Sequence, residues 1–143
     1  MKDILLSISG SQMQGDEDNS IELTTQGQLD FENGVGVLSY NDSEDDAENV
    51  ETRISVNGDV VTMQKTGSIE THFIFERGKT YITEYLTPFG ALDVTLYPTL
   101  VDAKIEEEKG RIELEYVLDI AGAQVVNRLN LNYTAENKQM PAN

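Results

Sequence analysis

The chain has 143 residues, a net charge of −16, 38% hydrophobic residues and no cysteine. This length fits one domain around one core, and the charge argues against nucleic acids and anionic membranes as partners, because phosphate repels it. Without cysteine there are no disulfides and no thiolate chemistry. The first ten residues alternate apolar residues with serine and lack the apolar run of a signal peptide, so we expect a cytoplasmic protein.

Apolar residues recur at every second position along most of the chain, which is the pattern of strands with one buried face. Between residues 99 and 109 the pattern also permits a short helix, because Thr99 and Asp102 resemble a capping box. Every second residue from Thr99 to Ile105 (Thr99, Val101, Ala103 and Ile105) fits a strand equally well, and we predict a strand there. The other alternating runs, in chain order, are residues 4–8, 21–23, 50–56, 69–75, 92–96, 112–120 and 125–133.

Turn residues separate these runs at short intervals. Asn57-Gly58 suits a two-residue type I′ hairpin, and Gly90 and Gly110 are expected to hold backbone conformations that a Cβ would strain. Further turns are expected at Asn33-Gly34, Arg77-Gly78, residues 87–90, Lys109-Gly110 and Ala121-Gly122.

Short loops imply antiparallel neighbours, since parallel pairs need long crossovers. The sequence therefore predicts an all-β fold: a single antiparallel up-and-down barrel of about 8–10 strands, with a two-sheet sandwich as the alternative. We expect one domain over residues 1–143, with a core from about 4 to 133 and a C-terminal tail over 134–143.

No motif in the chain predicts catalysis or metal binding. The acidic stretch 41–49 spaces its carboxylates as a calcium loop does, but Ala47 and Arg53 occupy the positions of the required glycine and the bidentate glutamate. His72 is the only histidine and is expected on the surface. We therefore expect no enzyme, metal or cofactor; if the protein were an enzyme, His72, Tyr85 and Arg53 would be the best candidates.

Aromatic residues concentrate in neighbouring predicted strands and the turn between them. They are expected to line the barrel interior, either as a ligand-binding surface or as an aromatic core plug. The candidate ligand-binding residues are Phe73, Phe75, Tyr81, Tyr85, Phe89 and Tyr116.

Residues 67–90, above all the stretch Tyr85-Leu-Thr-Pro-Phe-Gly90, resemble the DUF1934 (YwiB-like) family of small bacterial proteins. Residues 106–116 and 130–133 are also similar to that family. The resemblance implies a calycin-like β-barrel, related in architecture to lipocalins and streptavidin, and implies no activity or catalytic residues. Lipocalins usually carry a Gly-x-Trp near the first strand, whereas this chain has no tryptophan.

The sequence thus favours a non-enzymatic protein of uncharacterised function that holds a small, partly apolar ligand inside the barrel. The alternative is an acidic protein–protein interaction module with a side-chain-filled barrel, acting on a basic protein partner or as a homodimer.

Overall fold

The computed structural model describes residues 2–41, 50–67 and 70–136, apart from the side chains of 85–87. In these ranges every regular element is a strand, so the predicted all-β fold is confirmed. The strands are β1 (Lys2–Gln14), β2 (Glu17–Glu32), β3 (Val35–Asn41), β4 (Val50–Asn57), β5 (Val60–Gly67), β6 (Thr71–Glu76), β7 (Tyr81–Thr87), β8 (Gly90–Ile105), β9 (Lys109–Ile120) and β10 (Ala123–Ala135).

All of these strands belong to one antiparallel sheet that rolls into a nearly closed barrel. Except for β6 and β7, strands that follow one another in the chain pair with each other, and β1 also pairs with β10, which brings the two ends of the chain together. The strand order ends at β6 and β7, and no hydrogen-bonded ladder joins these two strands in the described part of the chain. The predicted up-and-down topology is therefore confirmed, with its one seam between β6 and β7.

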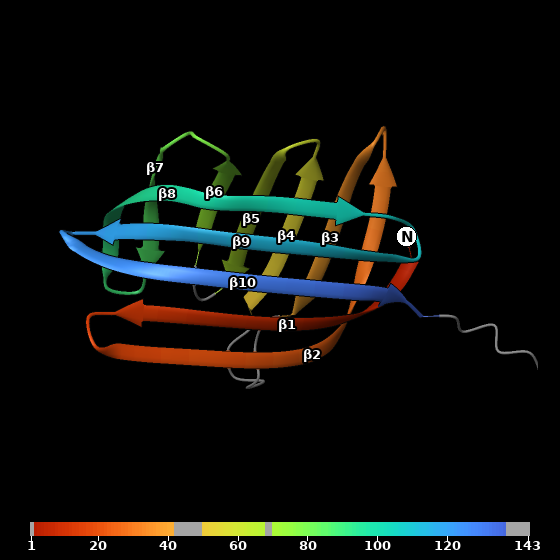
Figure 1. The fold of residues 1–143 in the computed structure, drawn as a ribbon, viewed down its shortest axis with the longest axis horizontal. Helices are drawn as coiled ribbons and strands as arrows, with labels where there is room; N and C mark the ends of the chain where they lie inside the picture. Colours follow the sequence, from red (N-terminus) through yellow and green to blue (C-terminus); the bar gives the residue numbers. More distant parts are fainter. Residues whose placement is uncertain (1, 42–49, 68–69, 137–143) are drawn as a thin grey trace, which may run out of the picture.

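The barrel is flattened into two faces whose strands cross (Figure 1). One face holds β1, β8, β9 and β10, and β3 to β7 cross behind it. β2 serves both faces, because residues 17–29 pair with β1 and residues 27–32 pair with β3. A strand that changes faces in this way needs a sharp bend, which is the usual place for a glycine.

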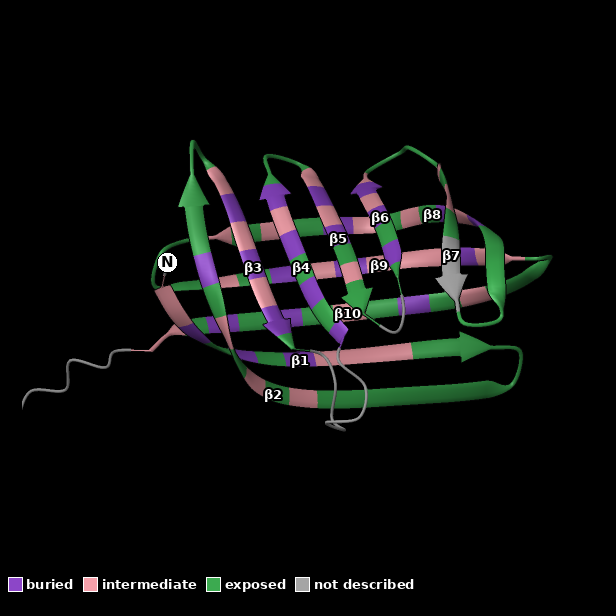
Figure 2. Cartoon of the chain, turned by 180° about the vertical axis from the view of Figure 1, so that it is seen from behind, coloured by how far each residue is buried: buried purple, intermediate pink, exposed green. Residues whose placement is uncertain are grey.

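The core fills the space between the two faces with aliphatic and aromatic side chains. In β1, Ile4, Leu6 and Ile8 are buried while the residues between them face outward, as the sequence pattern predicts. Buried positions alternate in the same way along β3, β4 and β6 (Figure 2). Most of the barrel interior is therefore solid, as in other small barrels.

Two of the predicted turns are two-residue hairpin loops, Asn33-Gly34 between β2 and β3 and Ala121-Gly122 between β9 and β10. Asn33 and Gly34 have φ values of 55° and 82°, and Ala121 and Gly122 have 52° and 91°. Positive φ at both central residues is the type I′ pattern, which matches the twist of the flanking strands.

Two other turns differ from the prediction. Asn57 pairs with Val60, so the two-residue loop is Gly58-Asp59, and only Gly58 has a positive φ. The type I′ prediction at Asn57-Gly58 is therefore wrong. Lys109-Gly110 is not a turn either, because both residues belong to β9 and Gly110 pairs with Ile105.

Residues 99–105 lie within β8, so the predicted strand is confirmed there. A β-bulge between Pro98 and Leu100 shifts the register. Val94 and Leu96 are buried before the bulge, and Val101 is buried after it. The bulge thus changes which residues face inward, from even to odd numbers.

The described residues contain no helix of the length and hydrophobicity needed to span a membrane.

Candidate ligand-binding site

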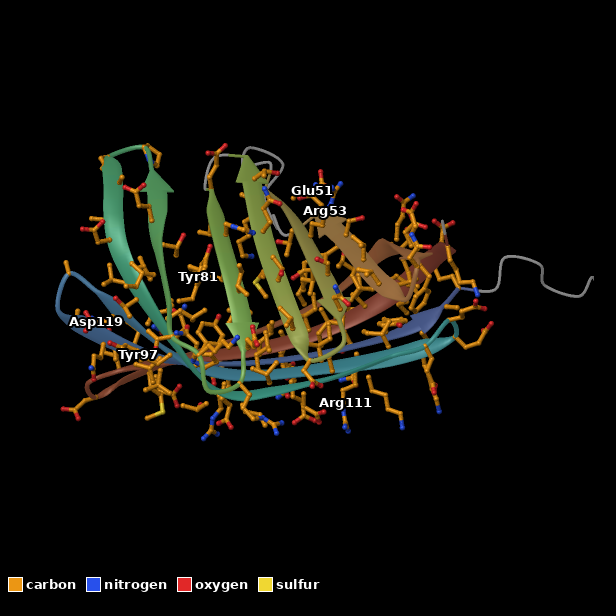
Figure 3. The ribbon with its side chains drawn as sticks, turned by 90° about the horizontal axis from the view of Figure 1, so that it is seen from above. Glu51, Arg53, Tyr81, Tyr97, Arg111 and Asp119 are labelled. Carbon is orange, nitrogen blue, oxygen red and sulfur yellow. The ribbon has the colours of Figure 1, made fainter. Side chains whose placement is uncertain are left out.

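The predicted aromatic cluster is only partly assembled in the barrel interior. Phe73 and Phe75 are buried on β6, and the ring of Phe75 meets that of Tyr116 edge-on, with 4.8 Å between centroids. Tyr81 on β7 is partly buried, packs against the core and lies between the two faces of the barrel (Figure 3). These rings stabilise the interior as edge-to-face pairs do elsewhere.

Phe89 and Tyr85 are the other two predicted aromatic residues. Phe89 lies at the β7–β8 turn and is 100% exposed, so the expectation that it lines the interior is wrong. Its position directly after Pro88 explains the exposure, since a residue at the tip of a two-residue loop has no opposite face to pack against. The side chain of Tyr85 lies outside the described residues.

A partly open pocket of about 260 Å³, called the mouth pocket below, lies among residues of β1, β2, β3, β5, β9 and β10. Of the predicted aromatic residues whose side chains are described, only Tyr116 lines it. The pocket is lined by Ile8, Gly10, Ser11, Gln12, Asn19, Ile21, Tyr40, Met63, Lys65, Tyr116, Asn127, Arg128 and Leu129.

Polar side chains form a row across the interior beside this pocket. Tyr40, Thr52, Lys65 and Thr71 are successive register partners on β3, β4, β5 and β6. Lys65 Nζ donates a hydrogen bond to Thr52 Oγ1 at 3.1 Å, and Thr52 is fully buried. The ammonium of Lys65 therefore lies inside the barrel.

Two further buried polar groups lie in the interior. Thr71 is 5% exposed, and its Oγ1 has no hydrogen-bond partner within the described part of the structure. Asn127 on β10 is 3% exposed, and its Nδ2 donates to the carbonyl oxygen of Val125 at 3.2 Å. Buried polar groups in such number are unusual for a barrel interior that only needs to be filled, because each one costs free energy unless it is hydrogen-bonded.

The charge of the pocket differs from that of the chain. Although the chain has 26 acidic residues, no carboxylate is among the described residues that line this pocket. Its charged lining residues are Lys65 and Arg128. Arg128 Nε pairs with Glu115 Oε1 at 2.7 Å.

Sequence reasoning missed Lys65 and Asn127 as site residues. Both occupy inward positions of their strands, Lys65 two residues after buried Met63 and Asn127 two residues before Leu129. The sequence did contain a signal for them: each is a polar residue at a position where the alternation of its strand predicts an inward-facing apolar side chain.

The residues considered for catalysis are not gathered into this pocket. His72 is exposed, and its ring meets Tyr81 edge-on at 6.4 Å. Arg53 lies on the outside of β4, where it pairs with Glu51 at 3.7 Å (Figure 3). In the described ranges no group of three or more His, Asp or Glu residues is placed to hold a metal ion, and the acidic residues 42–49 lie outside those ranges.

Burial affects the ionisation of two interior tyrosines. It raises the pKa of Tyr116 to about 12, because the phenolate would lose its hydration. Burial likewise raises the pKa of Tyr133 to about 12; the hydrogen bond to the backbone of Glu106 opposes this increase and the charge of the Glu106 carboxylate adds to it. Both hydroxyls therefore stay protonated well above neutral pH and can act as hydrogen-bond donors.

These pKa values predict a loss of stability at alkaline pH. An unfolded tyrosine loses its proton near pH 10, whereas the folded one keeps it until about pH 12, so the stabilising effect is complete below pH 10 and is lost as the pH rises to 12. Tyr116 should contribute about 2–3 kcal/mol to this loss. Urea unfolding across this pH window measures it.

The variant Tyr116→Phe provides the control, because it keeps the ring and removes the titrating group. Its free energy of unfolding should fall less steeply with pH than that of the wild type. Equal slopes for the two proteins would contradict the assignment to Tyr116.

The fold and the site define the class of protein: a small antiparallel β-barrel, nearly closed, with a pocket at one mouth. The chain belongs to the family described as a domain of unknown function, DUF1934, whose model matches residues 6–132. The resemblance seen in the sequence is therefore confirmed.

Two comparisons place the chain beside a relative from Bacillus subtilis. The sequence is 28% identical over 104 residues to the uncharacterized β-barrel protein YwiB of strain 168, covering 73% of this chain and 72% of that protein. The fold matches the crystal structure of the ywiB protein from Bacillus subtilis with a TM-score of 0.85 at 23% identity, over 95% of this chain and 93% of the other. This structural likeness supports the barrel and says nothing of a ligand.

Proposed function

We propose that the protein is a cytoplasmic, non-enzymatic binder of a small, partly apolar molecule, which it holds in the mouth pocket. The observation that carries the proposal is the lining of this pocket, in which the apolar side chains of Ile8, Ile21, Met63 and Leu129 lie among polar side chains from several strands. Binding sites for small molecules commonly have this composition, in which the apolar surface gives affinity and the polar groups fix orientation.

The size of the pocket limits the ligand. A volume of about 260 Å³ is below the range of ~300–1,000 Å³ found for drug-sized ligands. It corresponds to the liquid volume of about nine water molecules, and so to a ligand of about ten non-hydrogen atoms. Ile21 at the mouth is 63% exposed, and a ligand in the pocket would cover part of this apolar surface.

Gly10 offers a direct test, because it lines the pocket and an added Cβ there meets only ordinary contacts, the nearest being Arg128 O at 3.5 Å. Gly10→Val should fill the pocket and abolish binding. Stability should stay unchanged or rise by up to about 1 kcal/mol, because valine favours strands and glycine does not.

The matched control is Ser9→Val, which adds valine on the outer face of the same strand. Native mass spectrometry of freshly purified protein, and ligand-observed NMR with octanol and octanoate as probes, measure binding in the three chains. Wild type and Ser9→Val should bind and Gly10→Val should not. Equal binding by all three chains, or no binding of either probe by the wild type, would refute the proposal.

The interaction-module alternative has its own supporting observation. Ile82 on β7 is 74% exposed and Phe89 at the adjacent turn is 100% exposed, which gives the β7–β8 hairpin an apolar outer surface. Size-exclusion chromatography with light scattering tests self-association, and pull-downs at low salt test a basic protein partner. A monomeric mass in light scattering, together with pull-downs that recover no protein, would count against this alternative.

A further inference from the structure

We propose that two copies of this chain associate through the outer surface of β1, β8, β9 and β10, where a row of apolar side chains crosses the four strands. The members of this outer row are Met13, Val126, Val117 and Tyr97. The inference goes beyond the proposed function, because it concerns the outside of the barrel and does not depend on a ligand in the mouth pocket. It also assigns self-association to a surface other than the β7–β8 hairpin.

The strand register places the members of the outer row side by side. Met13 pairs with Val126, Val126 with Val117, and Val117 with Tyr97. All four have the opposite phase to the buried residues of their strands, so their side chains point away from the core. Side chains on register partners of adjacent strands lie about 5 Å apart, so these four form a continuous row.

The outer row is accessible to solvent. Met13 is 50% exposed, Val126 42% and Tyr97 41%, while Val117 between them is partly buried. Figure 3 shows Tyr97 on the outer side of the four strands, whereas Tyr81 lies between the two faces of the barrel. A partner that covers the row would remove apolar area from water, which is the main driving force of most protein–protein association.

The rows on either side of the outer row are mostly polar. On one side the next row is Ser11, Arg128, Glu115 and Leu100, and on the other side it is Gln124, Asp119 and Thr95. An apolar row between polar rows, in a chain with 26 acidic residues, is a contiguous patch rather than a set of scattered exposed residues. Such patches on the surface of a protein mark interaction sites.

The charges beside the outer row indicate that its partner is a second copy of the chain. Arg128 lies on one side of the row and Asp119 on the other. A two-fold axis along the row would bring Arg128 next to the partner's Asp119, and a two-fold axis along the strands would bring it next to the partner's Glu115. In both arrangements the apolar row packs against itself and unlike charges meet. A basic partner would instead meet Arg128 with a like charge.

The surface is large enough for a stable dimer. These four strands are 12 to 16 residues long. With strands about 4.8 Å apart and about 3.4 Å per residue, they present an outer surface of about 800 Å². A standard interface buries about 800 Å² on each partner, so the face can supply one half of such an interface.

Sedimentation equilibrium tests the proposal. Wild-type protein should be a dimer at about 100 μM, since interfaces of this size have dissociation constants of about micromolar or below. Val126→Lys should raise the Kd of the dimer at least about tenfold, because association would bury an ammonium in the apolar row. A wild type that stays monomeric at this concentration would overturn the proposal.

The matched control is Gln64→Lys, which makes the same change in charge at an exposed position of β5, on the other face of the barrel. Its Kd should stay within about twofold of wild type. Equal weakening by Val126→Lys and Gln64→Lys would overturn the proposal. Loss of the dimer in Ile82→Lys but not in Val126→Lys would also overturn it, because the interface would then lie on the β7–β8 hairpin.

The dependence on salt tests the apolar character of the interface. Two chains that each carry a charge of −16 repel one another, and salt screens this repulsion. The Kd should therefore fall severalfold between about 0.05 and 0.5 M NaCl. A Kd that rises with salt would show that charge attraction holds the two copies together and would contradict the role of the outer row.

Urea unfolding shows whether Val126→Lys folds. If it does not, Tyr97→Ser serves as the second variant, because it removes an exposed ring from the same row and adds no charge. Its Kd should rise severalfold, and an unchanged Kd would contradict the proposed interface.

Discussion

Replacing Gly27 with alanine should destabilise the barrel by about 3 kcal/mol, which is at the upper end of what overpacking a core costs. Gly27 is half-buried on β2 where this strand passes from pairing with β1 to pairing with β3, since it is the partner of both Ile4 and Tyr40. An added Cβ would lie 2.5 Å from Leu6 Cδ1 and 2.6 Å from the carbonyl oxygen of Ser39. The leucine methyl could move, but the Ser39 oxygen belongs to the backbone of β3, so the β2–β3 ladder itself would have to shift.

Urea unfolding of the variant measures this loss, with Gly10→Ala as the matched control. Gly10 also lies at an inward position of a long strand, but a Cβ there meets its nearest neighbour at 3.5 Å. Gly10→Ala should therefore leave stability unchanged or raise it slightly, since alanine restricts the unfolded chain more than glycine does. Similar free energies of unfolding for the two variants would show that β2 has room at the bend and would contradict the close approach.

The fold could be predicted because most strands have one buried and one solvated face. Ile112, Leu114 and Leu118 on β9 are buried, and the charged residues between them face outward, so a period of two is visible in the sequence. The β8 bulge left a weaker signal in the sequence: the alternating apolar residues have even numbers up to Leu96 and odd numbers from Val101 onward. A change of phase within one strand indicates an extra residue, here at the Pro98/Leu100 irregularity.

The candidate site could not be predicted in the same way. The alternation argument assigns polar residues to the outer face, and therefore overlooks Lys65 and Asn127 at inward positions. Phe89 shows the reverse error, because an aromatic residue was expected inside and the turn holds it in solvent. The pocket also depends on strands from both ends and the middle of the chain (β1, β2, β3, β5, β9 and β10), which are brought together only by the register of the nearly closed barrel.

Gly110→Ala is the other substitution with a large expected effect, and its physical reason differs from the one predicted from the sequence. Gly110 is not a turn residue with a positive φ: it pairs with Ile105 and Tyr133 inside the sheet. The ring of Tyr133 lies over it, and an added Cβ would overlap the ring atoms. Tyr133 is 2% exposed, and its hydroxyl donates to the carbonyl oxygen of Glu106 at 2.5 Å.

An alanine at this position must therefore displace the Tyr133 ring. The expected loss is about 3–4 kcal/mol, since it combines most of the packing of a buried aromatic side chain with one hydrogen bond. It should appear as a lower urea midpoint with an unchanged m-value, because the barrel still unfolds as a whole.

A double-mutant cycle with Tyr133→Leu separates this explanation from a general intolerance of β9. If the ring is what excludes a Cβ, Gly110→Ala should cost at least about 1.5 kcal/mol less in the Tyr133→Leu background than in wild type. Additive losses would mean that Gly110 is required for its backbone rather than for the ring above it.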